Sequence, residues 1–175
     1  KGIFWSDGIE FTAADVVYTI ETHLKANGLF WSAPVQINVA SVAAPDPQTV
    51  VFKLKKPNAR FHALFTVRWN AMWMMPKHIF EKETDLAAFK NEYPVTLGAY
   101  ILKSYDPNGQ WHLWERREDW DRSATAPLGE PAAKYVFYKN FGDEQTRTLA
   151  FIKNEYDVDT FMSPDSIAAS QAQNP

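Results

Sequence analysis

The most informative part of this 175-residue chain lies near its start: Trp5-Ser6-Asp7-Gly8-Ile9-Glu10-Phe11-Thr12-Ala13-Ala14-Asp15-Val16-Val17-Tyr18-Thr19-Ile20-Glu21. It predicts a strand end, a tight turn and a helix, in that order. The turn is expected at Ser6-Asp7-Gly8, because Asp can bond its own backbone two residues on and Gly accepts a positive φ.

The helix is predicted to begin after Thr12, a typical N-cap residue, with Asp15 three residues later to complete a capping box. Apolar residues then recur at helical spacing, so one face of the helix should be buried. They are Ala13, Val16, Val17, Ile20 and Leu24. Lys25-Ala26-Asn27-Gly28 predicts the end of the helix.

The rest of the chain predicts mixed helices and strands without regular strand–helix alternation, which indicates a mixed α/β (α+β) fold. We expect an irregular aromatic loop over 29–34, a hairpin of strands 37–42 and 49–55, short helices at 61–65, 76–80 and 85–90, a second hairpin over 98–115, a loop over 116–131, a strand over 134–139, a helix capped by Asp143, a short buried strand over 156–159, and a last helix opened by Ser163-Pro164.

Composition excludes several classes of protein. Hydrophobic residues make up 46% and charged residues 22%, an ordinary globular balance, and a net charge of −3 argues against a nucleic-acid surface. No apolar run approaches the length of a membrane span. The chain has no cysteine, which removes disulfides and thiolate metal sites. Because residues 1–5 resemble the middle of a strand, we expect the chain to be a piece of a longer protein.

Metal and catalytic sites are not predicted. The four histidines, His23, His62, His78 and His112, lack the spacing of metal ligands, so no metal or other cofactor is expected. A nucleophile elbow, a phosphate-binding glycine loop and a Ser/His/Asp signature are absent from the sequence. The acids at 7, 10, 115 and 119 could supply a carboxylate pair, but Asp7 is better explained by its turn and residues 115–119 by a solvated loop with local ion pairs.

Aromatic residues are the unusual feature, at 15% of the chain with seven Trp. Two clusters, Phe30-Trp31 and Trp69 to Trp73, flank irregular segments marked by Gly or Pro, where binding residues tend to lie. Trp faces stack on sugar rings or apolar side chains, and the indole N–H donates one hydrogen bond. Core packing and the lining of a cleft both remain open for Trp31 and Trp69.

The opening stretch resembles the signature of the family 5 extracellular solute-binding proteins, the binding components of bacterial ABC importers for peptides, nickel and some oligosaccharides. Four further blocks are similar to motifs of that family and occur in the same order. These are Met75-Pro76-Lys77-His78-Ile79, Pro94-Val95-Thr96-Leu97-Gly98-Ala99-Tyr100, Glu115-Arg116-Arg117-Glu118-Asp119-Trp120, and Asp143 to Val158. In the last block Asn154 stands where Gly is usual, and both residues tolerate a left-handed helix end.

The resemblance implies part of a type II periplasmic-binding-protein fold, in which two lobes close on a ligand by hinge motion. The chain would form part of the first lobe, with a smaller subdomain over 1–92 and part of the main subdomain over 93–175. The family also implies where ligand contacts arise. Transferred by motif order, the expected contacts are Phe30, Trp31, Trp69, Met72, Trp73, Phe161 and Met162.

The function implied by the resemblance is non-enzymatic capture of peptides in the periplasm or outside the cell, for delivery to an ABC permease in the inner membrane. The segment itself is not expected to insert into a membrane or to bind nucleic acid. An oligosaccharide ligand is the alternative within the family, favoured by the Trp content. A carbohydrate-active enzyme that uses Trp platforms and two acids is the alternative from another class.

Overall fold

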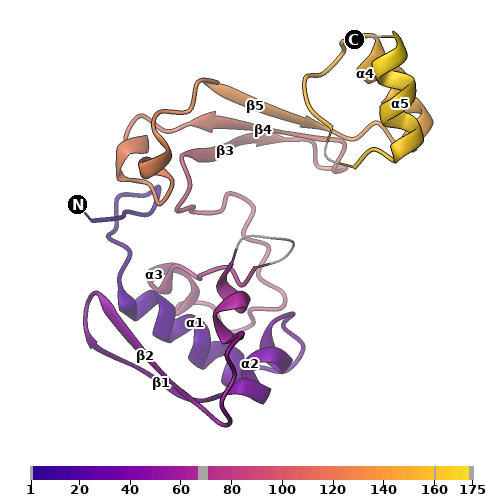
Figure 1. Cartoon of the computed structure of the whole chain (residues 1–175). Coiled ribbons are helices and arrows are strands. Elements are labelled where there is room, and N and C mark those ends of the chain that lie inside the picture. The colour runs from indigo at the N-terminus through magenta and orange to yellow at the C-terminus, as the bar shows by residue number, and fades with distance from the viewer. Residues whose placement is uncertain (1, 67–70, 160, 174–175) are drawn as a thin grey trace. The chain divides into compact units, whose positions relative to one another are not determined.

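The computed structural model describes residues 2–66, 71–159 and 161–173 (Figure 1). Contacts within the chain divide it into two compact units. Unit 1 comprises Lys1–Ile101 and Glu115–Lys134, and unit 2 comprises Leu102–Trp114 and Tyr135–Pro175. Within these units helices and strands are mixed, as the sequence predicts. The subdomain boundary predicted between residues 92 and 93 concerns the whole lobe and stays a prediction.

The opening turn and helix are confirmed. Gly8 has a φ of 88°, and Asp7 Oδ1 accepts a hydrogen bond from the Ile9 amide at 3.2 Å. Helix α1 (Ala13–Lys25) has Thr12 as its N-cap and a complete capping box with Asp15. Its end is followed by Gly28 at a φ of 90°. Local chemistry thus fixes the start of α1, whereas its C-cap residue, Ala26, is in an extended conformation.

The region after α1 differs from the prediction. Residues 32–38, expected as loop and strand, form helix α2 (Ser32–Asn38). Pro34 lies in the first turn, where its missing N–H is tolerated. Gln36 then stabilises both helices, because its side-chain amide donates to the carbonyls of His23 at 3.1 Å and Ala26 at 3.0 Å, at the C-terminus of α1. This placement buries Val35 fully and leaves Ile37 73% exposed.

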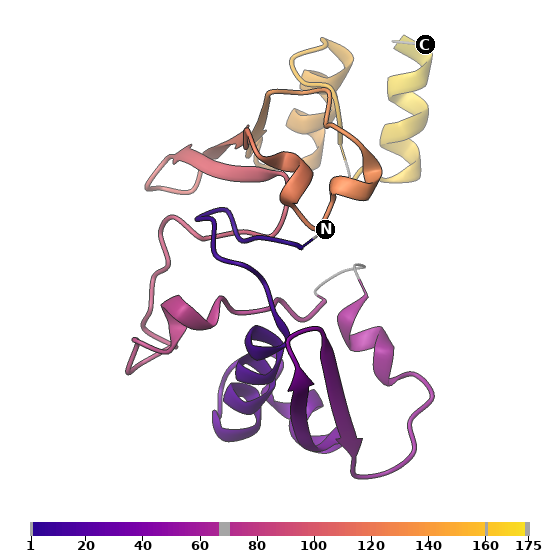
Figure 2. The same ribbon diagram turned by 90° about the vertical axis from the view of Figure 1, so that its left-hand side faces the viewer.

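The first hairpin is confirmed, although its first strand starts later than expected. Strands β1 (Val39–Asp46) and β2 (Thr49–Leu54) pair antiparallel, and α1 packs against them (Figures 1 and 2). Along β2, Val50, Phe52 and Leu54 are half-buried and the alternating residues are exposed. The apolar face of β2 therefore points toward the core, as its period-two pattern predicts.

The core of unit 1 lies between α1, α2, the hairpin and the segment after residue 70. Its buried members are Ile20, Val35, Val39 and Met72. Around it pack half-buried residues, among them Trp31, Phe52, Phe61 and Phe65. Burial of an aliphatic side chain such as Ile20 or Val35 stabilises the folded state by about 1.5–3 kcal/mol. Phe61 and Phe65 come from η1 (Phe61–Phe65), which confirms the short helix expected there as a 3₁₀ helix.

Two other expectations in unit 1 need correction. Asp85 Oδ1 accepts bonds from the amides of Ala87 and Ala88, yet only turns follow, so the helix predicted over 85–90 does not form. Arg117 is 4% exposed and not part of a solvated loop. Its guanidinium donates to the carbonyls of Phe4 and Trp5, both at 3.1 Å, and pairs with Asp119 at 2.7 Å. Arg117 thus anchors the opening stretch.

The remaining strands and helices follow the predicted order. Strands β3 (Tyr100–Tyr105), β4 (Trp111–Arg116) and β5 (Tyr135–Lys139) form a sheet in the order β3-β4-β5. Gly109, at a φ of 75°, closes the turn between β3 and β4. Between β4 and β5 lie η2 (Trp120–Arg122) and η3 (Ala126–Leu128). In unit 2, helices α4 (Glu144–Ile152) and α5 (Pro164–Gln173) lie side by side (Figures 1 and 2).

The segment between α4 and α5 is not a buried strand. Residues 156–159 have no strand pairing, and Val158 is 73% exposed. The predicted caps on either side are confirmed, since Asp143 accepts from the Thr146 amide and the Ser163 hydroxyl accepts from the Ser166 amide. Asn154 has a φ of 57°, the left-handed conformation expected at the end of α4. No helix within the described ranges is long and apolar enough to cross a membrane.

Candidate functional site

The predicted contact residues in unit 1 lie in two segments, one before α2 and one before α3 (Lys77–Phe80). Phe30 is 74% exposed, and its ring packs edge-on against Trp31 with centroids 5.3 Å apart. Trp31 also packs against the core. Trp73 is 81% exposed, whereas Met72 is 5% exposed and belongs to the core. Trp69 lies outside the described residues.

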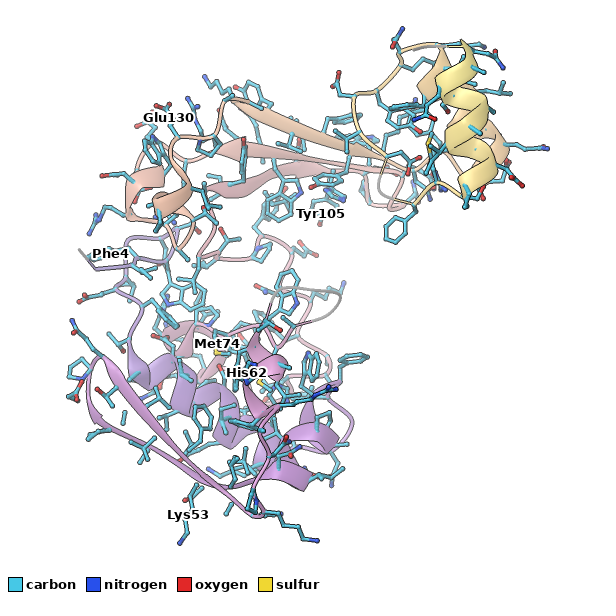
Figure 3. The ribbon with its side chains drawn as sticks, viewed as in Figure 1. Phe4, Lys53, His62, Met74, Tyr105 and Glu130 are labelled. Atoms are coloured by element: carbon cyan, nitrogen blue, oxygen red, sulfur yellow. The ribbon has the colours of Figure 1, made fainter. Side chains whose placement is uncertain are left out.

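Residues 71–77, which we call the Trp73 segment, are held through their backbone (Figure 3, where Met74 marks the segment). The Met72 amide donates to the Leu64 carbonyl at 2.9 Å. The Met75 amide donates to Thr19 Oγ1 at 2.9 Å, and the Lys77 amide donates to Asp15 Oδ1 at 3.0 Å. The segment therefore has fixed backbone positions on both sides of its exposed indole.

The start of α2 beside Trp31 is fixed by a buried polar pair. His23 Nδ1 lies 3.4 Å from Ser32 Oγ, and both residues are buried. Burial lowers the pKa of His23 below its ordinary value, which favours the neutral ring at neutral pH. The pair therefore joins α1 to the first residue of α2, next to Trp31, without introducing a buried charge.

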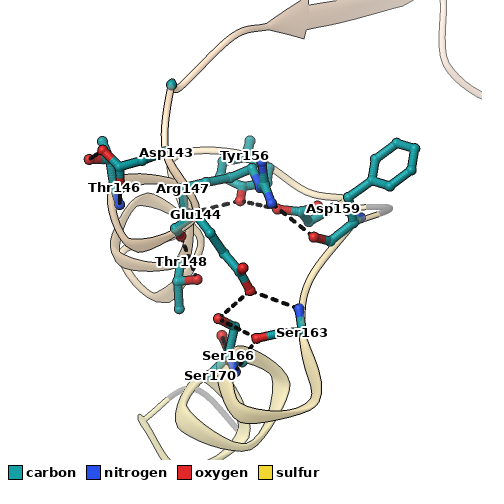
Figure 4. Close-up of polar contacts among 12 residues, drawn as sticks. Asp143, Glu144, Thr146, Arg147, Thr148, Tyr156, Asp159, Ser163, Ser166 and Ser170 are labelled. Atoms are coloured by element: carbon teal, nitrogen blue, oxygen red, sulfur yellow. Dashed lines mark hydrogen bonds and ion pairs between the residues drawn. The ribbon is translucent and has the colours of Figure 1, made fainter.

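The predicted contacts in unit 2, Phe161 and Met162, lie between α4 and α5. We call residues 156–159 and 161–163 the Phe161 segment. Phe161 is 61% exposed. Arg147 of α4 pairs with Asp159 at 2.7 Å and donates to the Phe161 carbonyl at 2.8 Å (Figure 4). Asp159 also accepts from the Phe161 amide at 2.8 Å and from the Tyr156 hydroxyl at 2.9 Å. An ion pair and its hydrogen bonds thus shape the backbone that presents Phe161.

These contacts change the ionisation of the groups involved. Burial raises the pKa of Tyr156 to about 12, assisted by its hydrogen bond to Asp159 and by the charge of that carboxylate. Burial alone would raise the pKa of Asp159. The Phe161 amide, the Tyr156 hydroxyl and the Arg147 charge outweigh it, so the pKa of Asp159 is lowered. Tyr156 is therefore neutral and Asp159 ionised at neutral pH.

Glu144 holds the other end of the Phe161 segment. Its Oε1 accepts from the Ser163 amide at 2.8 Å and from the Ser166 hydroxyl at 2.7 Å (Figure 4). The bonds from Ser163 and Ser166 lower the pKa of Glu144 from 4.5 to about 2. The carboxylate thus ties the first turn of α4 to the first turn of α5, and it is charged at every pH above the acid range.

Sequence patterns missed the residues that hold both segments. Thr19 and Asp15 of α1 accept from the amides of Met75 and Lys77, which lie 56 and 62 residues away. Arg147 of α4 donates to the Phe161 carbonyl, 14 residues away. A weak signal for Thr19 exists, because a polar residue on the apolar face of an amphipathic helix needs a buried partner. Neither the partner nor its distance of 56 residues along the chain can be read from that signal.

The described residues of the two segments do not form a metal centre. Within the ranges that the structure describes, no group of three or more His, Asp or Glu residues is placed to hold a metal ion. Asp7, a candidate for a carboxylate pair, accepts from the Ile9 amide and lies 2.6 Å from His78 Nε2. Its predicted role in the turn is confirmed, with a contact to α3 in addition.

The whole chain matches one family model, described as "Bacterial extracellular solute-binding proteins, family 5 Middle", over residues 1–175. This match covers the opening stretch and all the blocks that resemble the family. It spans both units.

Solved structures of binding proteins are similar over 99% of this chain, and two of them illustrate the likeness. One is a periplasmic oligopeptide-binding protein of an oligopeptide ABC transporter from Thermotoga maritima with mannohexaose bound, at 26% identity and a TM-score of 0.79 over 31% of that protein. The other is the oligopeptide-binding protein AppA from Bacillus subtilis in complex with a nonapeptide, at 22% identity and a TM-score of 0.80 over 33% of that protein. The mixed α/β fold is therefore that of periplasmic binding proteins, as predicted.

A curated relative from Brucella ovis, named as an ABC transporter peptide-binding protein, is 31% identical over 107 residues, which are 58% of this chain and 19% of that protein. This chain therefore spans about a third of the length of the similar structures, and the match to the Brucella protein covers about a fifth of that protein.

Proposed function

Because this chain belongs to the bacterial extracellular solute-binding proteins of family 5, we propose that it is part of a receptor that captures di- and oligopeptides. The receptor would work in the periplasm or at the cell envelope and deliver its ligand to an ABC permease in the inner membrane. Proteins of this family bind the substrates of ABC transporters, so this proposal assigns the chain no catalytic step. The peptide class is supported by the name of the Brucella relative and by the Thermotoga protein.

The observation that carries the proposal is the presentation of Trp73. Trp73 is 81% exposed, so most of the apolar surface of its ring faces water. Met72 on one side and Pro76 on the other are buried, so the exposed ring stands on a fixed backbone. A solute that covers this ring would remove its apolar surface from water. Phe30, Trp31, Trp69, Met72, Phe161 and Met162 remain the further proposed contacts, and the burial of Met72 gives it the least support among the described ones.

Capture is proposed to follow the two-lobe mechanism. A bound solute stabilises the closed form by the difference between its contacts in the closed and open forms. Peptide recognition would use backbone hydrogen bonds together with roomy side-chain pockets in which water is retained. Aromatic surfaces such as Trp73 suit this task, because they contact many side chains without requiring one shape.

An oligosaccharide is the second candidate ligand, favoured by one observation. The Thermotoga protein, named as oligopeptide-binding, is solved with mannohexaose bound. Exposed Trp rings stack on the apolar faces of sugars as readily as on apolar side chains, so the Trp73 segment does not discriminate between the two classes.

The test is a thermal-shift and calorimetric titration of the complete gene product that carries this chain, with a nonapeptide and with mannohexaose as probes. A ligand that binds only the native state raises the melting temperature. We expect the nonapeptide to do so, and Trp73→Ala to weaken its affinity at least about tenfold. Leu128→Ala is the matched control, because Leu128 is 86% exposed in the same unit and lies in η3, outside the proposed contacts.

The outcomes separate the candidates. Binding of mannohexaose alone would replace the peptide by an oligosaccharide. Binding of neither probe, or an equal loss of affinity in both variants, would contradict the proposal.

A further inference from the structure

Two buried polar side chains on the first helix contact the Trp73 segment. Thr19 is fully buried and Asp15 is 5% exposed, although both lie on a helix whose buried face is otherwise mainly apolar. Buried polar groups persist where their hydrogen bonds are made, so each of these side chains needs partners. Those partners indicate what the two residues do.

Thr19 joins α1 to the Trp73 segment. Its hydroxyl donates to the Asp15 carbonyl within the helix at 2.8 Å and accepts from the Met75 amide at 2.9 Å. The bond within the helix orients the hydroxyl proton and turns a lone pair toward Met75. A valine of the same shape would keep the packing and lose the acceptor, which would leave the Met75 amide without its partner.

Asp15 acts in two places at once. Its Oδ2 accepts from the Thr12 amide at 2.9 Å, which is the capping-box contact, and its Oδ1 accepts from the Lys77 amide at 3.0 Å. A capping box needs only the first of these bonds. The second bond spans 62 residues and fixes the end of the Trp73 segment where α3 begins.

The exposed indole lies between these fixed points. The Met72 amide is bonded to Leu64 and its side chain is buried in the core, Met75 and Lys77 are bonded to α1, and Pro76 is buried. Met72 is 5% exposed and the adjacent Trp73 is 81% exposed, so this anchored stretch of backbone carries the indole at the surface.

We propose that Thr19 and Asp15 are positioning residues for solute recognition: they hold the backbone of residues 72–77 so that Trp73 meets the solute in one orientation. This inference rests on the proposed function, because it takes Trp73 as a contact of the solute. Fixing an aromatic ring before binding reduces the ordering that binding would otherwise require, so affinity depends on the supports as well as on the ring.

The experiment compares two threonines that make the same bond within a helix. Thr148 of α4 is also buried, and its hydroxyl donates to the Glu144 carbonyl at 2.8 Å. In the complete gene product that carries this chain, Thr19→Val and Thr148→Val are followed by NMR, through the amide-exchange protection of Met75 and the order parameter of the Trp73 indole. We expect Thr19→Val to reduce the protection of Met75 at least about tenfold and to loosen the indole, and Thr148→Val to do neither.

The second readout is nonapeptide affinity in the complete gene product, with Thr19→Val, Trp73→Ala and the double variant. If Thr19 acts through Trp73, each single change weakens binding, and Thr19→Val weakens it no further once Trp73 is absent. A merely structural role would give additive losses instead. An oligosaccharide that proves to be the ligand replaces the nonapeptide in this cycle.

The results separate this inference from the proposed function. Unchanged NMR signals in Thr19→Val, equal changes in both threonine variants, or additive losses of affinity would overturn the positioning role even if the wild type binds peptide. If the wild type binds neither probe, the proposed function is wrong, and the role of Thr19 in solute recognition is overturned with it, whatever the NMR signals show.

Discussion

The Trp73 segment and the Phe161 segment each present an exposed aromatic residue, but they are held in opposite ways. The Trp73 segment is anchored by the buried side chain of Met72 and by backbone amides bonded to Leu64, Thr19 and Asp15. Of these four anchors, Asp15 alone is ionisable. The Phe161 segment is anchored largely by ionised side chains, namely Arg147, Asp159 and Glu144.

This difference predicts how each segment responds to pH and salt. Apolar burial and neutral hydrogen bonds change little with pH or salt. Contacts between ionised groups are lost when one partner is neutralised. Three of the four anchors of the Trp73 segment are uncharged. We therefore expect the position of Trp73 to depend less on pH and salt than that of Phe161, which depends on the charges around it.

The largest effect is expected from Met72→Ala. Met72 is 5% exposed and belongs to the core of unit 1, so its truncation should lower the free energy of unfolding by about 3 kcal/mol through lost burial and a residual cavity. Phe161→Ala is the counterpart in the other segment. Because Phe161 is 61% exposed, its removal should change that free energy by less than about 0.5 kcal/mol. Urea unfolding measures both, and equal losses would erase the contrast between the segments.

A smaller loss is expected from Asp159→Asn. The carboxylate is 4% exposed and pairs with Arg147, which is 26% exposed, so its neutralisation leaves a partly buried guanidinium without its counter-charge. We expect a loss of about 2 kcal/mol in the stability of unit 2, below that of a fully buried pair. The matched control is Asp157→Asn, since Asp157 is exposed two residues away. A similar loss in both variants would show that the ion pair does not hold the segment.

The opening helix shows how much of this fold can be predicted from sequence. Turn residues, the Thr12 and Asp15 capping box and the apolar stripe act within a few residues of one another, so the sequence predicts α1 closely. The alternation in 49–54 predicts β2 for the same reason. Residues 32–38 were predicted from local patterns as loop and strand, and this prediction was wrong. Here the hydrogen bonds of Gln36 to the end of α1 stabilise a helix instead.

The candidate site is predicted less completely. The resemblance indicates the segments that carry Trp73 and Phe161, because motif order survives along the chain. It does not indicate which side chains support them. Arg117 illustrates the limit, since its charge and neighbours predicted a solvated loop, whereas its partners Phe4 and Trp5 lie more than 110 residues away in sequence. Contacts of this kind depend on tertiary packing, which no local pattern contains.

Acid should release one end of the Phe161 segment and leave the Met75 contact in place. The pKa of Glu144 is about 2 in the folded chain against an ordinary 4.5, so the stability that its hydrogen bonds contribute is fully present above pH 4.5 and is lost as the pH falls toward 2. The lowered pKa of Asp159 acts in the same direction. Amide-exchange protection of Ser163, corrected for intrinsic rates, should fall over this range, whereas that of Met75, bonded to a neutral hydroxyl, should not follow the titration of Glu144.

Glu144→Gln is the control for this titration, because it removes the ionisable group and keeps one acceptor oxygen. Its Ser163 protection should be lower than that of the wild type at neutral pH and should lose the part of the pH dependence that Glu144 contributes. A wild-type Ser163 amide that stays equally protected from pH 6 to 2 would contradict the assignment of that contact to a charged carboxylate.

The smallest effect is expected from Lys77→Ala, and its size separates backbone from side-chain anchoring. The Lys77 backbone amide is bonded to Asp15, while its ammonium group lies 4.0 Å from Glu81 in an exposed pair. Exposed pairs of this spacing contribute about 0.3 kcal/mol, and alanine keeps the amide. The free energy of unfolding, measured with urea, should therefore change by less than about 0.5 kcal/mol. The amide-exchange protection of Met75 should not change. A loss as large as that of Asp159→Asn would mean that a surface charge also holds the Trp73 segment, and the two segments would then differ less than their contacts indicate.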